Sequence, residues 1–379
     1  MTIRKEYLKI KSFFVEWART LDRGLLWAIL ALIICGIFLT FSASPAVAER
    51  VIKTKDTFYF VKKQLFFLFP SVLLMFGVSM LSPKHVRRFS FLIFVSFFIL
   101  LICTLLFGTE VKGAKRWLYF PGFSIQPSEF IKPAFAVVCA WIFASGRLIK
   151  GFPGIPIAGL IYAAVISLLL LQPDFGMSIT ISAIWGSQLF LAGISFWWII
   201  LLSLGALGGV GAAYKLLPHV QSRINRFLNP ESGGDSFQVD TSLNALHNAG
   251  WFGRGPGEGI IKSKLPDAHT DFILAVAAEE YGFLMSIFVV ALFAFIVFRG
   301  FYIMSKEKNL FNMLAVAGLL TQFGVQAFIN MASTLDLIPT KGMTLPFISY
   351  GGSSLLSLAF GLGVILSLTR RHPTQGGLE

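Results

Sequence analysis

A few charged residues lie inside or beside the most apolar segments of the sequence, where a charge is costly and therefore marks a candidate site. Glu129 and Lys132 are three residues apart, which places them on one face of a helix. They form either a self-neutralising pair that helps the helix enter a membrane, or a polar cavity in which Lys132 binds an anionic ligand. Glu279 and Glu280 are adjacent and point about 100° apart on a helix, so we expect that they cannot both face the same partner. The remaining charges of this kind are Asp174, Asp336 and Lys341.

Asp271 differs from the other acidic residues because it stands where a long polar segment meets an apolar one. It comes directly before Phe272 and the apolar residues that follow. A partly desolvated carboxylate at such a junction suits a general base. A helix N-cap is the competing interpretation, since Thr270 or Asp271 also suits the first position of the next helix. Position alone favours the cap.

Signatures of phosphate and metal binding are weak in this sequence. The glycine-rich stretch 253–259 does not follow a predicted strand and lacks the spacing of a phosphate-binding loop, so we expect a tight extracellular turn. The three cysteines fall in apolar runs, and no Cys/His cluster accompanies them. We therefore expect neither a disulfide nor a zinc site.

The composition is that of a membrane protein. Of 379 residues, 55% are hydrophobic and only 13% are charged, whereas a soluble domain carries about 25% charge. This balance excludes an ordinary cytosolic enzyme, a disordered chain and a disulfide scaffold. The formal charge of +13 suggests nucleic acid at first. Basic residues that flank membrane spans explain the charge better, because no soluble basic segment is present to hold a duplex.

Apolar runs of about the length of one membrane span recur along the chain. They predict an all-α polytopic membrane protein with about ten transmembrane helices. The ten runs cover residues 24–48, 65–81, 89–108, 128–146, 155–171, 177–191, 195–214, 272–298, 310–331 and 345–368. The first run ends in residues that resemble a signal-peptidase site, but its length predicts a retained signal anchor.

One long polar segment, residues 215–271, separates the seventh run from the eighth. Loops of this length are uncommon and usually functional, and residues 239–249 within it predict a short amphipathic helix. An even number of spans places both termini on one side, and the excess of Lys and Arg there predicts that this side is the cytoplasm. We thus expect cytoplasmic tails at 1–23 and 372–379, and a membrane domain at 24–371 with a large extracellular (periplasmic) loop at 215–271.

Three groups of motifs give the chain a family resemblance. The first two are Gly-Ala-Lys-Arg-Trp-Leu at 113–118 with Gln-Pro-Ser-Glu-Phe-Ile-Lys at 126–132, and Leu-Pro-Asp-Ala-His-Thr-Asp-Phe at 265–272 with Ala-Glu-Glu-Tyr-Gly at 278–282. The third runs from Pro339 to Ser354 and contains Thr-Lys-Gly-Met-Thr-Leu-Pro-Phe-Ile-Ser-Tyr-Gly-Gly. In this order, with ten spans, the chain resembles the SEDS family (shape, elongation, division and sporulation). Its Pro-Thr-Lys-Gly-x-Thr segment resembles the division branch rather than the elongation branch.

The resemblance implies a peptidoglycan glycosyltransferase that polymerises lipid II at the outer face of the inner membrane, enriched at the division septum. The family's essential aspartate lies in a His-Thr-Asp-Phe motif, so Asp271 inherits the role of general base in an inverting transfer that releases undecaprenyl diphosphate. The departing diphosphate needs cations, for which Lys132, Arg116 and Lys341 are the candidates. The substrate-binding residues that we expect are Lys132, Glu129, Arg116, Gln126, His269, Thr270 and Lys341.

The same resemblance implies partners rather than a resident cofactor. A divalent cation, Mg²⁺ or Mn²⁺, can share the work of the basic residues, but no sequence feature requires one. The chain lacks a transpeptidase signature, so cross-linking must come from another protein, for which the family implies a class B penicillin-binding protein. Lipid II, the growing glycan strand and other division-site membrane proteins complete the expected partners. A lipid II flippase or other transporter, and a non-catalytic division scaffold, are the alternative functions.

Overall fold

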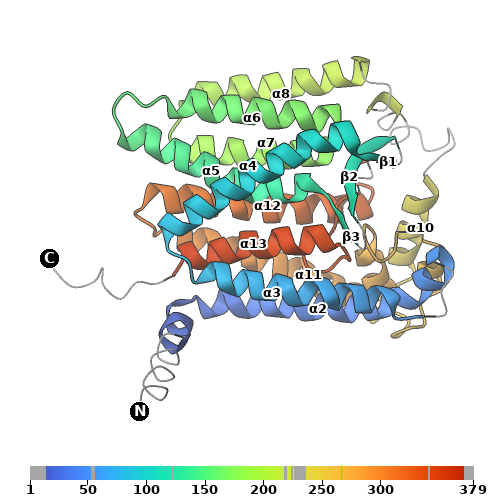
Figure 1. Cartoon of the computed structure of the whole chain (residues 1–379). Coiled ribbons are helices and arrows are strands. Elements are labelled where there is room, and N and C mark those ends of the chain that lie inside the picture. Colours follow the sequence, from blue (N-terminus) through green and yellow to red (C-terminus); the bar gives the residue numbers. More distant parts are fainter. Residues whose placement is uncertain are drawn as a thin grey trace, which may run out of the picture.

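The computed structural model describes residues 14–52, 56–111, 113–120, 123–216, 220–222, 225, 236–265, 267–339 and 342–370. Within these ranges, ten long helices lie side by side, one for each predicted apolar run (Figure 1). They are α2 (Arg23–Val47), α3 (Tyr59–Ser79), α4 (Pro83–Phe107), α5 (Pro127–Leu148), α6 (Gly154–Leu171), α7 (Phe175–Leu191), α8 (Phe196–Leu216), α11 (Ile273–Met304), α12 (Leu310–Thr334) and α13 (Gly352–Leu368). Seven of them are long and apolar enough to cross a membrane, α7 and α13 are shorter apolar helices, and α8 has 21 residues. The predicted fold class is confirmed.

Several helices begin earlier than the apolar runs that predicted them. The runs at 65–81 and 89–108 belong to helices that start at Tyr59 and Pro83. A helix continues through Lys and Arg as long as its backbone hydrogen bonds form, and Pro83 stands at the first turn, where its missing N–H costs nothing. At the start of α2, the Asp22 carboxylate accepts the Leu25 N–H at 3.0 Å and pairs with Arg299 at 2.7 Å.

The two ends of the helix bundle differ (Figure 1). The N-terminal end of α2 and the C-terminal end of α13 lie at one end. The opposite end carries a small sheet, the loop helix α10 (Ser236–His247) and the start of α11. Among the described residues, a π-helical turn η1 (Ala48–Ile52) and a 3₁₀ turn η3 (Ile261–Ser263) belong to the same end.

The sheet is a regular element of the described chain that the sequence did not predict. It contains the antiparallel strands β1 (Thr109–Val111), β2 (Ala114–Phe120) and β3 (Phe123–Ile125), in that order. Thr109 pairs with Trp117, and Leu118 pairs with Ile125. The sheet fills the connection between α4 and α5, and it therefore positions the motif that contains Arg116.

Helices α5 and α12 are the most enclosed spans, and α13 is buried along most of its length. The outer helices instead expose large apolar side chains such as Phe107 and Phe298, as lipid-facing helices do. The predicted helix in the long loop is confirmed as α10. Its buried face contains Val239, Ser242 and Ala245, whereas Leu243 and Leu246, which we expect on the apolar face of this helix, are only half-buried.

Residues 342–351, between α12 and α13, turn back among the helices; we call them the re-entrant segment. Leu345 and Ile348 are fully buried, and the Leu345 N–H donates to the Ser349 hydroxyl at 2.8 Å. Phe347 has a positive φ of 61°, and its carbonyl packs so closely on α2 that a side chain at Gly36 would collide with it. Irregular backbone is tolerated at membrane depth only when protein encloses it. The surrounding helices supply that enclosure and the hydrogen-bond partners.

Candidate active site

The His-Thr-Asp segment, residues 269–271, is held through its main chain. Its three carbonyl oxygens accept, in order, from the Tyr350 N–H at 3.0 Å, from the Ser349 hydroxyl, and from the Asn330 side-chain amide at 2.9 Å. Two of these donors belong to the re-entrant segment and the third belongs to α12. The segment that carries the predicted catalytic residue is therefore fixed from two sides.

The side chain of Asp271 does not cap a helix. Helix α11 begins at Ile273 with Phe272 at the N-cap, and no described residue makes a side-chain capping hydrogen bond there. The Thr270 hydroxyl donates instead to the Asp267 carbonyl at 3.2 Å. The half-buried Asp271 carboxylate lies against the re-entrant segment, since its Oδ2 would be 3.4 Å from a Cβ at Gly342. The cap interpretation that position alone favoured is therefore wrong.

His269 lies two residues before Asp271 and is buried between two aromatic rings. The ring centroids of Phe60 and Tyr350 are 4.1 Å and 5.7 Å from the centroid of the imidazole. Burial lowers the pKa of His269 to about 4, although the charge of Asp267 opposes the shift. The imidazole is therefore neutral near pH 7, and its Nδ1 makes no hydrogen bond to any described residue.

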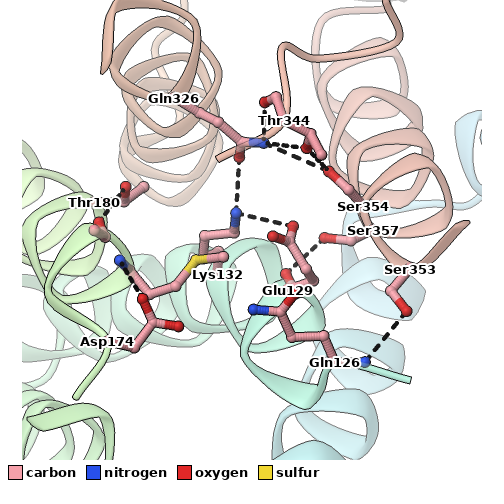
Figure 2. Close-up of polar contacts among 12 residues, drawn as sticks. Gln126, Glu129, Lys132, Asp174, Thr180, Gln326, Thr344, Ser353, Ser354 and Ser357 are labelled. Atoms are coloured by element: carbon pink, nitrogen blue, oxygen red, sulfur yellow. Dashed lines mark hydrogen bonds and ion pairs between the residues drawn. The ribbon is translucent and has the colours of Figure 1, made fainter. Parts of the chain in front are cut away.

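Glu129 and Lys132 form a buried ion pair near the start of α5. Lys132 is 0% exposed, and its Nζ lies 2.9 Å from Glu129 Oε2. The same Nζ donates to Gln326 Oε1 of α12 at 2.7 Å (Figure 2). An ammonium group has three donors, and these two partners leave one without an acceptor among the described residues. Glu129 Oε2 makes the charge contact but no well-aligned hydrogen bond.

A polar network surrounds this pair. Gln326 Nε2 donates to the Thr344 carbonyl at 3.1 Å and faces the hydroxyls of Thr344 and Ser354, which lie 2.8 Å from each other. The Ser357 hydroxyl donates to the Glu129 carbonyl at 2.6 Å. Figure 2 shows these groups converging on Lys132 from α5, α12, α13 and the re-entrant segment. The structure confirms a buried, self-neutralising pair, which lies within a polar network of the bundle. That Lys132 binds an anionic ligand stays a prediction.

Helix α12 joins the two parts of the site through a row of polar side chains four residues apart, which we call the α12 polar row: Gln326, Asn330 and Thr334. Gln326 holds Lys132 and Thr344, whereas Asn330 and Thr334 bind the Asp271 carbonyl at 2.9 Å and 3.5 Å. Residues four apart lie on one helix face. The sequence interpretation missed this row, although its spacing within an apolar run is a readable signal.

The structure gives Arg116 and Gln126 other neighbours. Arg116, on β2, donates to the Pro173 carbonyl and lies 3.6 Å from the carboxylate of Asp174, which caps α7. The Gln126 backbone N–H donates to the Ser353 hydroxyl at 3.2 Å. Among the described residues, neither side chain makes a hydrogen bond or ion pair with the Lys132 network. Lys341 lies outside the described residues. A substrate-binding role for each of them stays a prediction.

The expectation for the adjacent acids Glu279 and Glu280 is wrong, because both serve one loop. The Glu279 carboxylate accepts the backbone N–H groups of residues 260, 261 and 262 at 2.7, 2.8 and 3.1 Å. Glu280 accepts the Gly257 N–H at 2.9 Å, the Ser42 hydroxyl and the ammonium of Lys262. We call this arrangement the loop clamp. Two carboxylates about 100° apart reach one partner because the loop curves around the helix.

The glycine-rich stretch is a turn, as predicted, and it packs on α11. Gly253 has a φ of 75°, and a side chain there would collide with the Glu280 carbonyl. Helix α11 is kinked at Gly282, whose φ of 80° favours glycine. Within this stretch the Gly257 N–H donates to the Glu280 carboxylate, and the N–H groups of Arg254 and Gly255 donate to main-chain carbonyls of α11. These N–H groups are therefore not available to a phosphate, which argues against a phosphate loop. Within the described ranges, no group of three or more His, Cys, Asp or Glu side chains could hold a metal ion.

The family model FTSW_RODA_SPOVE, described as a cell cycle protein, matches residues 23–373. The chain belongs to the SEDS family. A relative in Caulobacter vibrioides (strain NA1000 / CB15N), "Probable peptidoglycan glycosyltransferase FtsW", is 46% identical over 95% of this chain and 92% of its own length. A relative of the same name in Trichlorobacter lovleyi is 37% identical over 92% of this chain and 93% of its own. The predicted resemblance to this family and to its division branch is confirmed.

Solved SEDS structures have the same fold. A chain in a peptidoglycan synthase complex that coordinates polymerization and crosslinking is 25% identical, with a TM-score of 0.76 over 92% of this chain and 97% of that one. The rod-shape-determining protein RodA of Thermus thermophilus is 25% identical, with a TM-score of 0.68 over 92% and 96%. This SEDS chain is accordingly a multi-pass membrane protein.

Proposed function

We propose that this chain is a peptidoglycan glycosyltransferase that polymerises lipid II into β-1,4-linked glycan during cell division. One observation carries the proposal: the main chain around Asp271 is bound at three consecutive carbonyls, and the helix that binds it also holds the buried cation Lys132. A carboxylate on a fixed main chain and a buried cation held by the same helix suit a reaction that needs one base and a stabilised anionic leaving group. The names of the SEDS relatives support the same activity.

The proposed transfer inverts the donor sugar. The 4-hydroxyl of a lipid II GlcNAc attacks the anomeric carbon of the MurNAc at the end of the growing chain. Asp271 takes the hydroxyl proton as the new C–O bond forms, and the bond from the anomeric carbon to the diphosphate oxygen breaks. Undecaprenyl diphosphate leaves with the bonding electrons. As in glycosidases, the transition state carries oxocarbenium character.

Lys132 serves the leaving group in this mechanism. Its ammonium has a donor beyond those used by Glu129 and Gln326, so it can bind a diphosphate oxygen while it keeps its place in the pair. Glu129 holds Lys132 in position, and Arg116, Lys341 and Gln126 are the further candidates for the diphosphate and sugar. His269 and Thr270 belong to the acceptor side because they adjoin Asp271. A divalent cation, Mg²⁺ or Mn²⁺, is a candidate to assist Lys132.

The proposed location follows from the orientation of the bundle. The end of membrane domain 24–371 that carries the sheet, α10 and Asp271 faces the periplasm. The tails at 1–23 and 372–379 face the cytoplasm, and the protein is enriched at the division septum. A class B penicillin-binding protein cross-links the product, as the synthase complex among the relatives suggests. Other division-site membrane proteins complete the assembly.

The full chain, purified with its class B partner and given lipid II, tests the proposal. We expect an SDS-stable glycan polymer that lysozyme digests. Movement of lipid II across vesicle membranes without polymer would instead support a transporter. Partner binding with neither polymer nor movement would support a scaffold. Either of these results would overturn the proposed function.

A further inference from the structure

We propose that Asn330 of α12 is a positioning residue that holds Asp271 at the correct place for proton transfer; this inference rests on the proposed function. Asn330 is 1% exposed, and its Nδ2 donates to two carbonyls, that of Asp271 at 2.9 Å and that of Met343 at 2.7 Å. A side-chain amide has two N–H donors, so both are used. The residue thereby ties the aspartate's main chain to the re-entrant segment.

A second side chain of α12, Gln326, also holds the re-entrant segment, and this explains why the position of Asn330 matters for catalysis. Gln326, one turn earlier on α12, donates to the carbonyl of Thr344, the residue after Met343, and accepts from Lys132. Consecutive carbonyls of one segment are thus bound by two side chains from one helix face. The spacing between the base and the cation is set by α12, and a misplacement of about 1 Å can cost about 10²-fold in rate.

A merely structural role is the alternative, and the chain contains a matched control for it. Gln188 of α7 is 0% exposed, and its Nε2 also donates to two carbonyls, those of Ala136 at 2.6 Å and Leu314 at 3.1 Å. In both residues the amide oxygen has no partner among the described residues. Leu314 precedes Asn330 by 16 residues on α12, about 24 Å along the axis. Gln188 therefore makes the same kind of tie far from Asp271.

The experiment compares Asn330→Leu and Asn330→Ala with Gln188→Met in the full chain with its partner. Each change removes two amide-to-carbonyl hydrogen bonds, so we expect similar decreases in the detergent unfolding temperature for Asn330→Leu and Gln188→Met. For the folded protein, we expect both Asn330 variants to lower kcat for lipid II about 30- to 100-fold while KM stays within about threefold. Gln188→Met should keep kcat within about threefold of wild type.

Several results would overturn the positioning role. They are a wild-type kcat in folded Asn330 variants, a change in KM alone, an equal loss of kcat in Gln188→Met, or a failure of both Asn330 variants to fold while Gln188→Met folds. Failure of the proposed function itself looks different, because wild type and Gln188→Met would then make no polymer either.

Discussion

Two buried lysine–glutamate pairs lie in the described part of this molecule, and their surroundings differ. In the loop clamp, Lys262 donates to Glu280 and to the carbonyls of Ser42 at 3.3 Å and Gly257 at 3.1 Å, so each ammonium donor has an acceptor. In the site, Lys132 has Glu129 and Gln326 alone among the described residues, and Glu129 Oε2 lacks an aligned hydrogen bond. Both lysines are nearly inaccessible to solvent, with side-chain exposures of 7% and 0%.

The difference shows that burial of a charge does not by itself mark a functional site in a membrane protein. A buried pair whose donors and acceptors are all satisfied fastens two segments together, and it has no capacity left for a ligand. A buried pair with a remaining donor can bind an anion without first breaking a bond. By this criterion we expect the loop clamp to be structural and the Glu129–Lys132 pair to belong to the proposed site.

The largest expected effect separates activity from stability at the site pair. Glu129→Gln combined with Lys132→Met removes both charges, so no unpaired ion stays buried, and such replacements are often near neutral for stability. We expect polymerisation to fall at least about 100-fold, because the leaving diphosphate loses its cation. The unfolding temperature should change by only a few degrees. Equal losses of activity and stability would mean that the pair serves insertion and folding alone.

The loop clamp should respond in the opposite way. Lys262→Met leaves the buried Glu280 carboxylate without its cation, which costs about 3–5 kcal/mol of stability. We expect a lower unfolding temperature, with the activity of the protein that stays folded within a few-fold of wild type. The neighbouring Lys264 is exposed, so Lys264→Met is the matched control and should leave the unfolding temperature unchanged. A stable Lys262→Met protein with no activity would assign the clamp to catalysis.

A smaller effect distinguishes the two regions by the pH dependence of stability. The site region contains the buried His269, whereas none of the described residues that bond to the clamp carboxylates is a histidine. Burial lowers the folded-state pKa of His269 to about 4, below the 6.5 of a free imidazole, so protonation favours the unfolded state. Stability should be fully present above about pH 6.5 and fall by about 1.4 kcal/mol per pH unit toward pH 4. His269→Phe should flatten this slope in unfolding measurements. His247→Phe, at an exposed position, should retain it; a wild-type slope in His269→Phe would contradict the assignment.

The sequence predicts the ten helices well because an apolar run of span length is a local property of the chain. The motif around Asp271 likewise predicts a segment whose main chain the structure binds at three consecutive carbonyls. What the sequence does not predict depends on contacts between distant segments. The loop that binds Glu279 and Glu280 arrives from residues 257–262, and only the folded chain shows that it curves around α11. The short strands around Arg116 carry no strong alternation of apolar and polar residues, so the sequence predicts a loop there.

The polymerisation of lipid II by Asp271→Asn, measured beside wild type and Asp267→Asn, tests the central claim most directly. Both variants remove one negative charge from the same segment, but only Asp271 is proposed to take the acceptor's proton. We expect Asp271→Asn to express and bind its partner normally and to make less than about 1% of the wild-type polymer. Asp267→Asn should keep most of the activity. Normal polymerisation by Asp271→Asn would contradict the assignment of the base.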